Sequence, residues 1–280
     1  MFKNSLKTAV LMAAMGGLIM GISSFFGRSG LLIGAVLAFA MVGGSYWFSD
    51  KLAIAQAHAV PVAERDAPQL FAAVRDLCTV ADMPMPRIYM TPDQQPNAFA
   101  TGRNERHAVV AVTQGLLEVL TPEEVKGVLA HELSHIRHRD ILIGSVAAAM
   151  AMAITLVARM AMFGAMFGGR SDDRDSNPIA EIAMLILAPV AAGLIQMAVS
   201  RSREFEADRG AKELIGTGEP LATALEKLDA YSKRIPMNVN PAQASAYIVN
   251  PLTGQNVSFK NLFSTHPSME ARIARLREIN

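Results

Sequence analysis

Four long apolar runs without charged residues alternate with polar sequence along this chain. They extend over residues 8–27, 29–49, 141–158 and 182–200. Each run has close to the ~20 residues that a membrane-spanning helix needs, so the pattern predicts two transmembrane hairpins. A buried core helix would explain one such run, but it is a weak explanation for four of them. Tyr46 and Trp47 close the second run, a position typical of the aromatic belt at a membrane surface.

The second pair of runs is less regular than the first. Arg159 follows the third run directly, and Pro189 interrupts the fourth. For the first run a cleaved signal peptide is an alternative, with Lys3 and Lys7 as its basic start. That run is long for a signal peptide and no A-x-A cleavage pattern follows it. We therefore expect four spanning helices. For the second hairpin, a shallow insertion that does not cross the whole bilayer is the alternative.

The distribution of Lys and Arg near the ends of the runs predicts the orientation. With the N-terminus inside, the inner flanks hold Lys3, Lys7, Lys51, Arg137, Arg139, Arg201 and Arg203. The outer loops hold only Arg28, Arg170 and Arg174. This excess of inner positive charge predicts that both termini lie in the cytoplasm.

The two polar blocks lie on the same, inner side of the membrane in this topology. They can therefore form one domain that the second hairpin interrupts. The predicted organisation is a first hairpin, a first domain part, a second hairpin and a second domain part, over residues 1–50, 51–140, 141–199 and 200–280. The fold class that follows is a mainly α membrane protein with four transmembrane helices and a cytoplasmic α+β domain that contains a small sheet.

Local patterns predict the elements of that domain. Leu70, Val74 and Leu77 have helical spacing, which indicates an amphipathic helix over residues 68–81. Short strands rich in Val, Ile and Tyr are predicted at residues 87–91 and 108–113, with a possible edge strand at 97–102 between them.

Two helices of the domain have recognisable starts. Thr121-Pro-Glu-Glu124 is a capping box with Pro at the first helical position, and it opens a helix towards Asp140. Pro267 can open a last helix near the C-terminus in the same way.

Composition excludes some classes of protein. The formal net charge is +1, which argues against a nucleic-acid binder. A single cysteine, Cys78, excludes an intrachain disulfide and any metal site built from cysteines alone.

The predicted helix after Thr121 contains His131-Glu-Leu-Ser-His135. Histidines four residues apart project from one helix face, so two ring nitrogens can bind one Zn²⁺ at ~2.0–2.1 Å. Glu132 then lies beside the metal rather than on it, where it can accept a proton from an attacking water. The pattern is short, and a solvated helix face with two surface histidines is the alternative explanation.

A catalytic zinc site usually has three protein ligands and an open position. Glu204 is the candidate third ligand, because it shares a helix face with Asp208 one turn further on. Asp208 can accept the free N–H of a ligand histidine and orient its ring. Two alternatives remain at this point. Glu204 can pair with Arg201 or Arg203 in a salt bridge, and Glu206 can be the ligand in its place.

The combination of His131-Glu-x-x-His135 with Ser-Arg-x-x-Glu204-x-x-Ala-Asp208 after a hydrophobic hairpin resembles the HtpX membrane metallopeptidases. These are similar in their catalytic core to the CAAX prenyl proteases. The resemblance covers nearly the whole chain, including residues 96–102 and 265–267. It implies a zincin-like domain of the gluzincin type with one Zn²⁺ per chain, in which His131, His135 and Glu204 are the ligands and Glu132 is the general base.

The resemblance also implies a function and a location. Such enzymes are endopeptidases at the inner face of a bacterial inner membrane, where they act on misfolded or damaged membrane proteins in quality control and stress response. The expected partners are therefore polypeptides and the lipid bilayer. Asn97, Ala98 and Phe99 would line the cleft and pair with the substrate backbone as an added strand. His266 and Arg272 would lie near the site, where either can donate to the oxyanion, unless they are a helix cap and a surface arginine.

Three other functions are compatible with parts of the pattern. An intramembrane zinc protease carries its HExxH inside a spanning segment, but here Glu123, Glu124 and Lys126 precede the motif. A prenyl-protein-processing protease would share the catalytic residues. A non-catalytic, zinc-stabilised membrane scaffold would not need a general base such as Glu132.

Overall fold

The computed structural model describes residues 2–24, 27–151, 201–235, 237, 239, 244, 246–251 and 267–278. The predicted fourth apolar run, the end of the third run and His266 lie outside the described residues.

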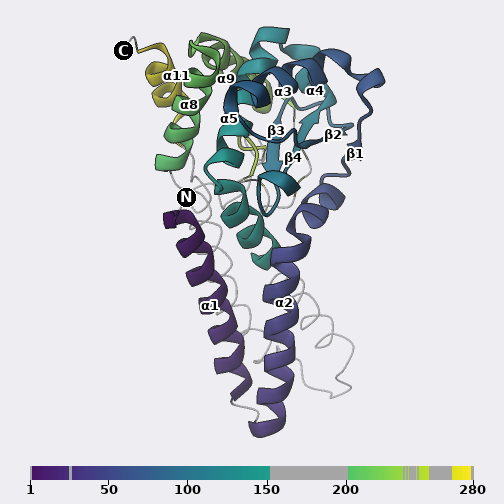
Figure 1. The fold of residues 1–280 in the computed structure, drawn as a ribbon, viewed down its shortest axis with the longest axis vertical. Helices are drawn as coiled ribbons and strands as arrows, with labels where there is room; N and C mark the ends of the chain where they lie inside the picture. Colours follow the sequence, from purple (N-terminus) through teal and green to yellow (C-terminus); the bar gives the residue numbers. More distant parts are fainter. Residues whose placement is uncertain are drawn as a thin grey trace, which may run out of the picture.

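Helices α1 (Phe2–Ser24) and α2 (Gly27–Gln56) form a hairpin that extends away from the rest of the described chain (Figure 1). They coincide with the first two predicted runs. The segment Leu31–Gln56 is long and apolar enough to cross a membrane. Leu32 and Phe39 on this helix are 72% and 83% exposed, which is unfavourable in water and expected in lipid. Among the described residues this is one clear candidate span, so four spans are not established.

A shorter apolar helix, Asp140–Ala151, packs against this hairpin. Its side chains Ile143, Val146 and Met150 share a buried cluster with Leu11 and Met15 of α1. The third predicted run therefore begins as a helix in contact with the first hairpin.

The sheet has four strands in the order β1-β2-β4-β3. The strands are β1 (Val60–Pro61), β2 (Arg87–Thr91), β3 (Ala98–Thr101) and β4 (Val109–Thr113). β2 and β4 are parallel, whereas β1 pairs with β2 and β3 pairs with β4 in antiparallel fashion. The strands predicted near residues 87–91, 97–102 and 108–113 are confirmed, as is the small mixed sheet.

The helices around the sheet are α3 (Pro68–Ala81), α4 (Gln114–Val119), α5 (Pro122–Arg137), α8 (Arg201–Ile215), α9 (Glu219–Ser232) and α11 (Met269–Arg277), with short 3-10 turns at Glu64–Asp66 and Glu105–His107. Among these helices, α3 and α5 begin where the sequence predicts. The capping box at the start of α5 is present, since Thr121 and Glu124 bond to each other's backbone N–H groups. At the last helix the cap is Ser268, whose side chain accepts from the N–H of Ala271, rather than Pro267.

Helix α5 does not continue to Asp140 as the sequence predicts. It ends at Arg137, and Arg139 adopts a left-handed conformation with φ 57°. The chain therefore turns between α5 and the helix that begins at Asp140. This turn brings Asp140 back towards His135.

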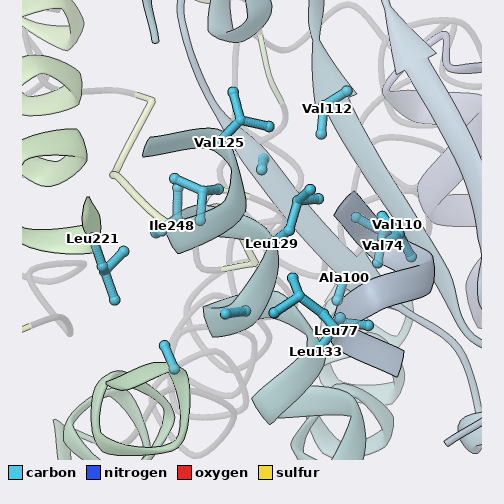
Figure 2. Close-up of a cluster of buried hydrophobic side chains, with 14 of the residues drawn as sticks. Val74, Leu77, Ala100, Val110, Val112, Val125, Leu129, Leu133, Leu221 and Ile248 are labelled. Atoms are coloured by element: carbon cyan, nitrogen blue, oxygen red, sulfur yellow. The ribbon is translucent and has the colours of Figure 1, made fainter. Parts of the chain in front are cut away.

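The core lies between α5, the sheet and the helices that follow residue 200 (Figure 1). Figure 2 shows Leu129 and Leu133 of α5 among Val110 and Val112 of β4. The same cluster includes side chains from beyond residue 200, namely Ala211, Leu221, Leu225, Leu228, Ile248 and Leu276. The two polar blocks thus contribute to one core.

Gly127 allows α5 to approach α9 closely. A Cβ atom at this position would lie 2.7 Å from the backbone nitrogen of Leu221, which is closer than packed atoms tolerate. This contact fixes the face of α5 that turns towards α9, and with it the direction of His131 and His135, about one and two turns further along.

Candidate active site

Helix α5 presents His131, Glu132 and His135 in the buried region where it packs on α8. His131 is 1% exposed and Glu132 is 2% exposed. The side chain of His135 is 15% exposed. Placing three ionisable groups so close together, two of them buried, costs free energy unless each is paired or serves a function. This cluster is therefore the strongest site candidate in the described chain.

The two histidines point to a common position with Glu204 of α8. Their Nε2 atoms lie 3.1 Å apart. Glu204 Oε1 lies 3.6 Å from Nε2 of His135, and Glu204 Oε2 lies 3.8 Å from Nε2 of His131. One ligand atom from each residue lies within 4.8 Å of the other two. Ligand atoms around tetrahedral zinc at ~2.0–2.1 Å are separated by about 3.3 Å, so this donor set fits such a metal.

Asp208 and Arg272 hold His131 from behind. Asp208 Oδ1 lies 3.0 Å from His131 Nδ1. Arg272, from α11, donates from Nη2 to Asp208 Oδ1 at 2.7 Å and from Nε to Asp208 Oδ2 at 2.9 Å. Burial alone would raise the pKa of Asp208, but the charge of Arg272 and the hydrogen bonds hold it below its usual value. An anionic Asp208 accepts the Nδ1–H of His131 and leaves Nε2 available as a ligand.

The protonation of the three α5 side chains follows from burial and neighbouring charge. Burial lowers the pKa of His131 to about 4, so this ring is neutral near pH 7, as a metal ligand must be. Burial raises the pKa of Glu132 to about 7. Burial lowers the pKa of His135 less than Asp140 and Glu204 raise it, and the result is about 9. A metal ion at His135 would have to replace that proton.

A cavity of about 60 Å³ adjoins these residues. Its walls include Ala100, Glu132, His135, Ser145, Arg203 and Ala246. This volume holds a few water molecules but no extended peptide.

The edge of β3 is paired with a later segment of the chain itself. Phe99 forms a β-bridge with Tyr247, and the N–H of Ile248 donates to the carbonyl of Ala98 at 3.0 Å. The side chain of Asn97 donates to the carbonyl of Val249 at 2.8 Å. A substrate strand at Asn97, Ala98 and Phe99 would first have to displace this segment.

Three further predicted site residues, Glu206, Arg272 and His266, have different positions relative to the cluster. Glu206, the rival ligand, has a side chain that is 47% exposed and lies 4.0 Å from Arg209, away from the cluster. Arg272 is fully buried and is not a surface arginine. It is not among the residues that line the described cavity. Its guanidinium lies against Asp208, Glu204, the carbonyl of Ile248 and the ring of His131. His266 lies outside the described residues.

Sequence reasoning missed Asp140 and Arg203 as members of the site. Both line the cavity, and Asp140 Oδ2 lies 3.4 Å from Nδ1 of His135. A carboxylate that directly precedes an apolar run and follows HExxH by five residues was a signal that could have suggested a role for Asp140.

Comparison with known proteins gives consistent matches over the chain. The model of Peptidase family M48 matches residues 64–280. Proteins described as "Protease HtpX homolog" from Burkholderia thailandensis and Burkholderia mallei are each 50% identical to this chain. Each alignment covers 99% of this chain and 97% of the relative.

A solved structure also resembles this chain. The crystal structure of S. mikatae Ste24p matches with a TM-score of 0.51 and 19% identity, over 99% of this chain and 66% of that one. At this level of identity the likeness concerns the fold alone.

Proposed function

Since this chain belongs to peptidase family M48 and is a membrane-bound metalloprotease, we propose that it is a zinc endopeptidase that cleaves misfolded or damaged membrane proteins. One observation carries this proposal. His131 and His135 of α5 and Glu204 of α8 lie close enough together to bind one metal ion. Two imidazoles and one carboxylate form a known ligand set of catalytic zinc, which favours zinc over harder ions such as Mg²⁺.

Glu132 is the proposed general base. Zinc at the three ligands would polarise the scissile carbonyl and make an attacking water more acidic. Glu132 accepts the proton of that water and passes it to the leaving amine. Burial raises the pKa of Glu132 above its usual value, which makes its carboxylate a stronger proton acceptor.

Asp208 is the proposed orienting carboxylate for His131, and Arg272 holds Asp208 in turn. The paired hydrogen bonds between them support this role. The two bonds to Asp208, and a place outside the described cavity lining, favour this positioning role of Arg272 over donation to an oxyanion. His266 stays a proposal for the oxyanion donor, on the resemblance alone.

Substrate binding at Asn97, Ala98 and Phe99 stays a proposal with one added requirement. The segment that pairs with this edge must give way, or the substrate must use the backbone further along β3. Ala100 supports the second route, because it lines the cavity together with Glu132.

We propose the inner membrane as the location, with residues 1–50 and 141–199 as its two hairpins. Residues 51–140 and 200–280 would form one cytoplasmic catalytic domain, which the shared core supports. Asp140 lines the cavity and also begins an apolar helix that packs on the first hairpin. A site this close to membrane helices favours membrane proteins as substrates.

The alternatives have less support. Full-length identity of 50% to HtpX homologues favours this function over prenyl-protein processing. Family membership favours an enzyme over a non-catalytic scaffold.

Chelation tests the proposed metal and activity together. The purified full-length protein in detergent is expected to carry about one zinc per chain and to degrade casein. Removing the metal should abolish degradation, and adding Zn²⁺ should restore it. Degradation that survives complete metal removal, or that only Mn²⁺ or Co²⁺ restores, would contradict a zinc enzyme.

Topology is tested with reporter fusions. A reporter placed after Asn280 is expected on the cytoplasmic side, and one within residues 170–178 on the opposite side, because positive charges flank the proposed inner ends. A cytoplasmic signal from both fusions would mean that the second hairpin does not cross the bilayer.

A further inference from the structure

Each of the two α5 histidines has its Nδ1 atom against a buried carboxylate. Asp208 Oδ1 lies 3.0 Å from Nδ1 of His131, and Asp140 Oδ2 lies 3.4 Å from Nδ1 of His135. Both carboxylates come from outside α5, one from α8 and the other from the start of the helix Asp140–Ala151. Their side chains are 4% and 5% exposed.

The turn after α5 is what directs Asp140 to His135. On a continuous helix, residues five positions apart are rotated by about 140°, so the carboxylate would leave the face of the histidine. Here α5 closes with bonds from the N–H of His138 to Ser134 and from the N–H of Arg139 to Ile136. The left-handed Arg139 then redirects the chain. A non-glycine residue in this conformation costs free energy, so the turn persists because the surrounding packing stabilises it.

The positive charge of Arg203 lies near the buried carboxylate of Asp140. Arg203 is 5% exposed and lines the same cavity. Burial lowers the pKa of Arg203, while the negative charges of Asp140 and Glu204 oppose that change. The guanidinium of Arg203 therefore brings positive charge near the carboxylate of Asp140, which also lies against the ring of His135.

The helix that begins at Asp140 is fixed at two other places. Ile143, Val146 and Met150 pack against α1 in the hairpin cluster. Ser145 shares a hydrogen bond of 2.8 Å with Thr101 at the end of β3. The position of Asp140 therefore depends on the apolar helices and on the edge strand, and not on α5 alone.

We propose that Asp140 is a positioning residue for His135, and that it ties this ligand to the helix packed on the membrane hairpin. It accepts the Nδ1–H of His135 and leaves Nε2 directed at the metal, as Asp208 does for His131. This inference rests on the proposed function, because it takes His135 as a metal ligand.

Zinc affinity of the full-length protein in detergent tests the role of Asp140. Competition with a chromophoric chelator is expected to show affinity for Zn²⁺ lowered by about 10–100-fold in Asp140→Asn, similar to Asp208→Asn. Asp140→Glu should recover part of the loss, since it keeps the acceptor. The control is Asp66→Asn, whose side chain is 61% exposed beside Arg65, and its affinity should equal that of the unchanged protein.

Melting of the metal-free protein separates positioning from folding. The metal-free Asp140→Asn protein is expected to melt somewhat below the metal-free unchanged protein, since the change removes negative charge near the buried Arg203. Positioning predicts in addition that the stabilisation by added Zn²⁺ is reduced. Unchanged affinity in Asp140→Asn, or equal destabilisation with and without metal, overturns the inference.

His135→Ala distinguishes failure of the proposed zinc site from failure of the proposed role of Asp140. If this variant loses zinc while Asp140→Asn keeps it, the proposed function stands and the role of Asp140 falls. If the unchanged protein binds no zinc, both fall.

Discussion

Replacing Glu132 with Gln is expected to abolish peptide hydrolysis while zinc stays bound. Glu132 lies beside His131 and His135 and is not a member of the ligand group. The amide keeps the shape of the side chain but cannot accept the proton of the attacking water. Loss of a general base costs typically ~10²–10⁴-fold in rate. The measurement is casein degradation by purified protein, with zinc content determined on the same sample.

Glu123→Gln is the matched control for this experiment. Glu123 is exposed in the first turn of the same helix, so the same chemical change should leave both activity and metal unaltered. Turnover near the normal rate in zinc-loaded Glu132→Gln would remove Glu132 from the role of base.

Replacing Glu204 with Gln is expected to remove most of the metal and all measurable activity. Its carboxylate lies within 4 Å of both histidine nitrogens, at 3.6 Å and 3.8 Å. A neutral amide is a much poorer ligand for a divalent cation than a carboxylate. Zinc content after dialysis and casein degradation measure the effect.

Glu206→Gln on the same helix is the control for Glu204→Gln. Residues two apart on a helix point in directions about 200° apart, so only one of the two glutamates can face the histidines. The side chain of Glu206 is 47% exposed, and its change should do little. If Glu206→Gln lost the metal and Glu204→Gln kept it, the assignment of the third ligand would be wrong.

Elements with local signals could be predicted from the sequence. The range of α3 matches the helix that Leu70, Val74 and Leu77 indicate, and the start of α5 matches its capping box. Caps and periodicity act within a few residues, so they can be read from one stretch of sequence. The end of α5 could not be predicted in the same way, because its left-handed Arg139 depends on packing from elsewhere.

The candidate site likewise contains residues that local spacing could predict and residues whose contacts are distant in sequence. Spacing on one helix singles out His131, Glu132 and His135 as candidates. On the other helix spacing favours Glu204 with Asp208 but leaves Glu206 open, and the resemblance was needed to choose between them. The position of Arg272 could not be predicted from local sequence, because its partner Asp208 is 64 residues away. The approach of Asp140 to His135 could not be predicted, because on a continuous helix its carboxylate would point away from that ring. The pairing of Tyr247 with Phe99 crosses a still longer separation and has no local signal.

Sheet edges with free backbone groups serve as templates for aggregation. Here one edge strand, β1, is only two residues long and ends in Pro61, which has no N–H to offer. At the other edge, Tyr247 and Ile248 pair with β3. A protease whose proposed substrates are misfolded chains meets many exposed strands. The short β1 offers little backbone for pairing, and at β3 an added strand must first displace Tyr247 and Ile248. That requirement disfavours further copies of the enzyme and any strand that does not bind strongly enough to displace the segment.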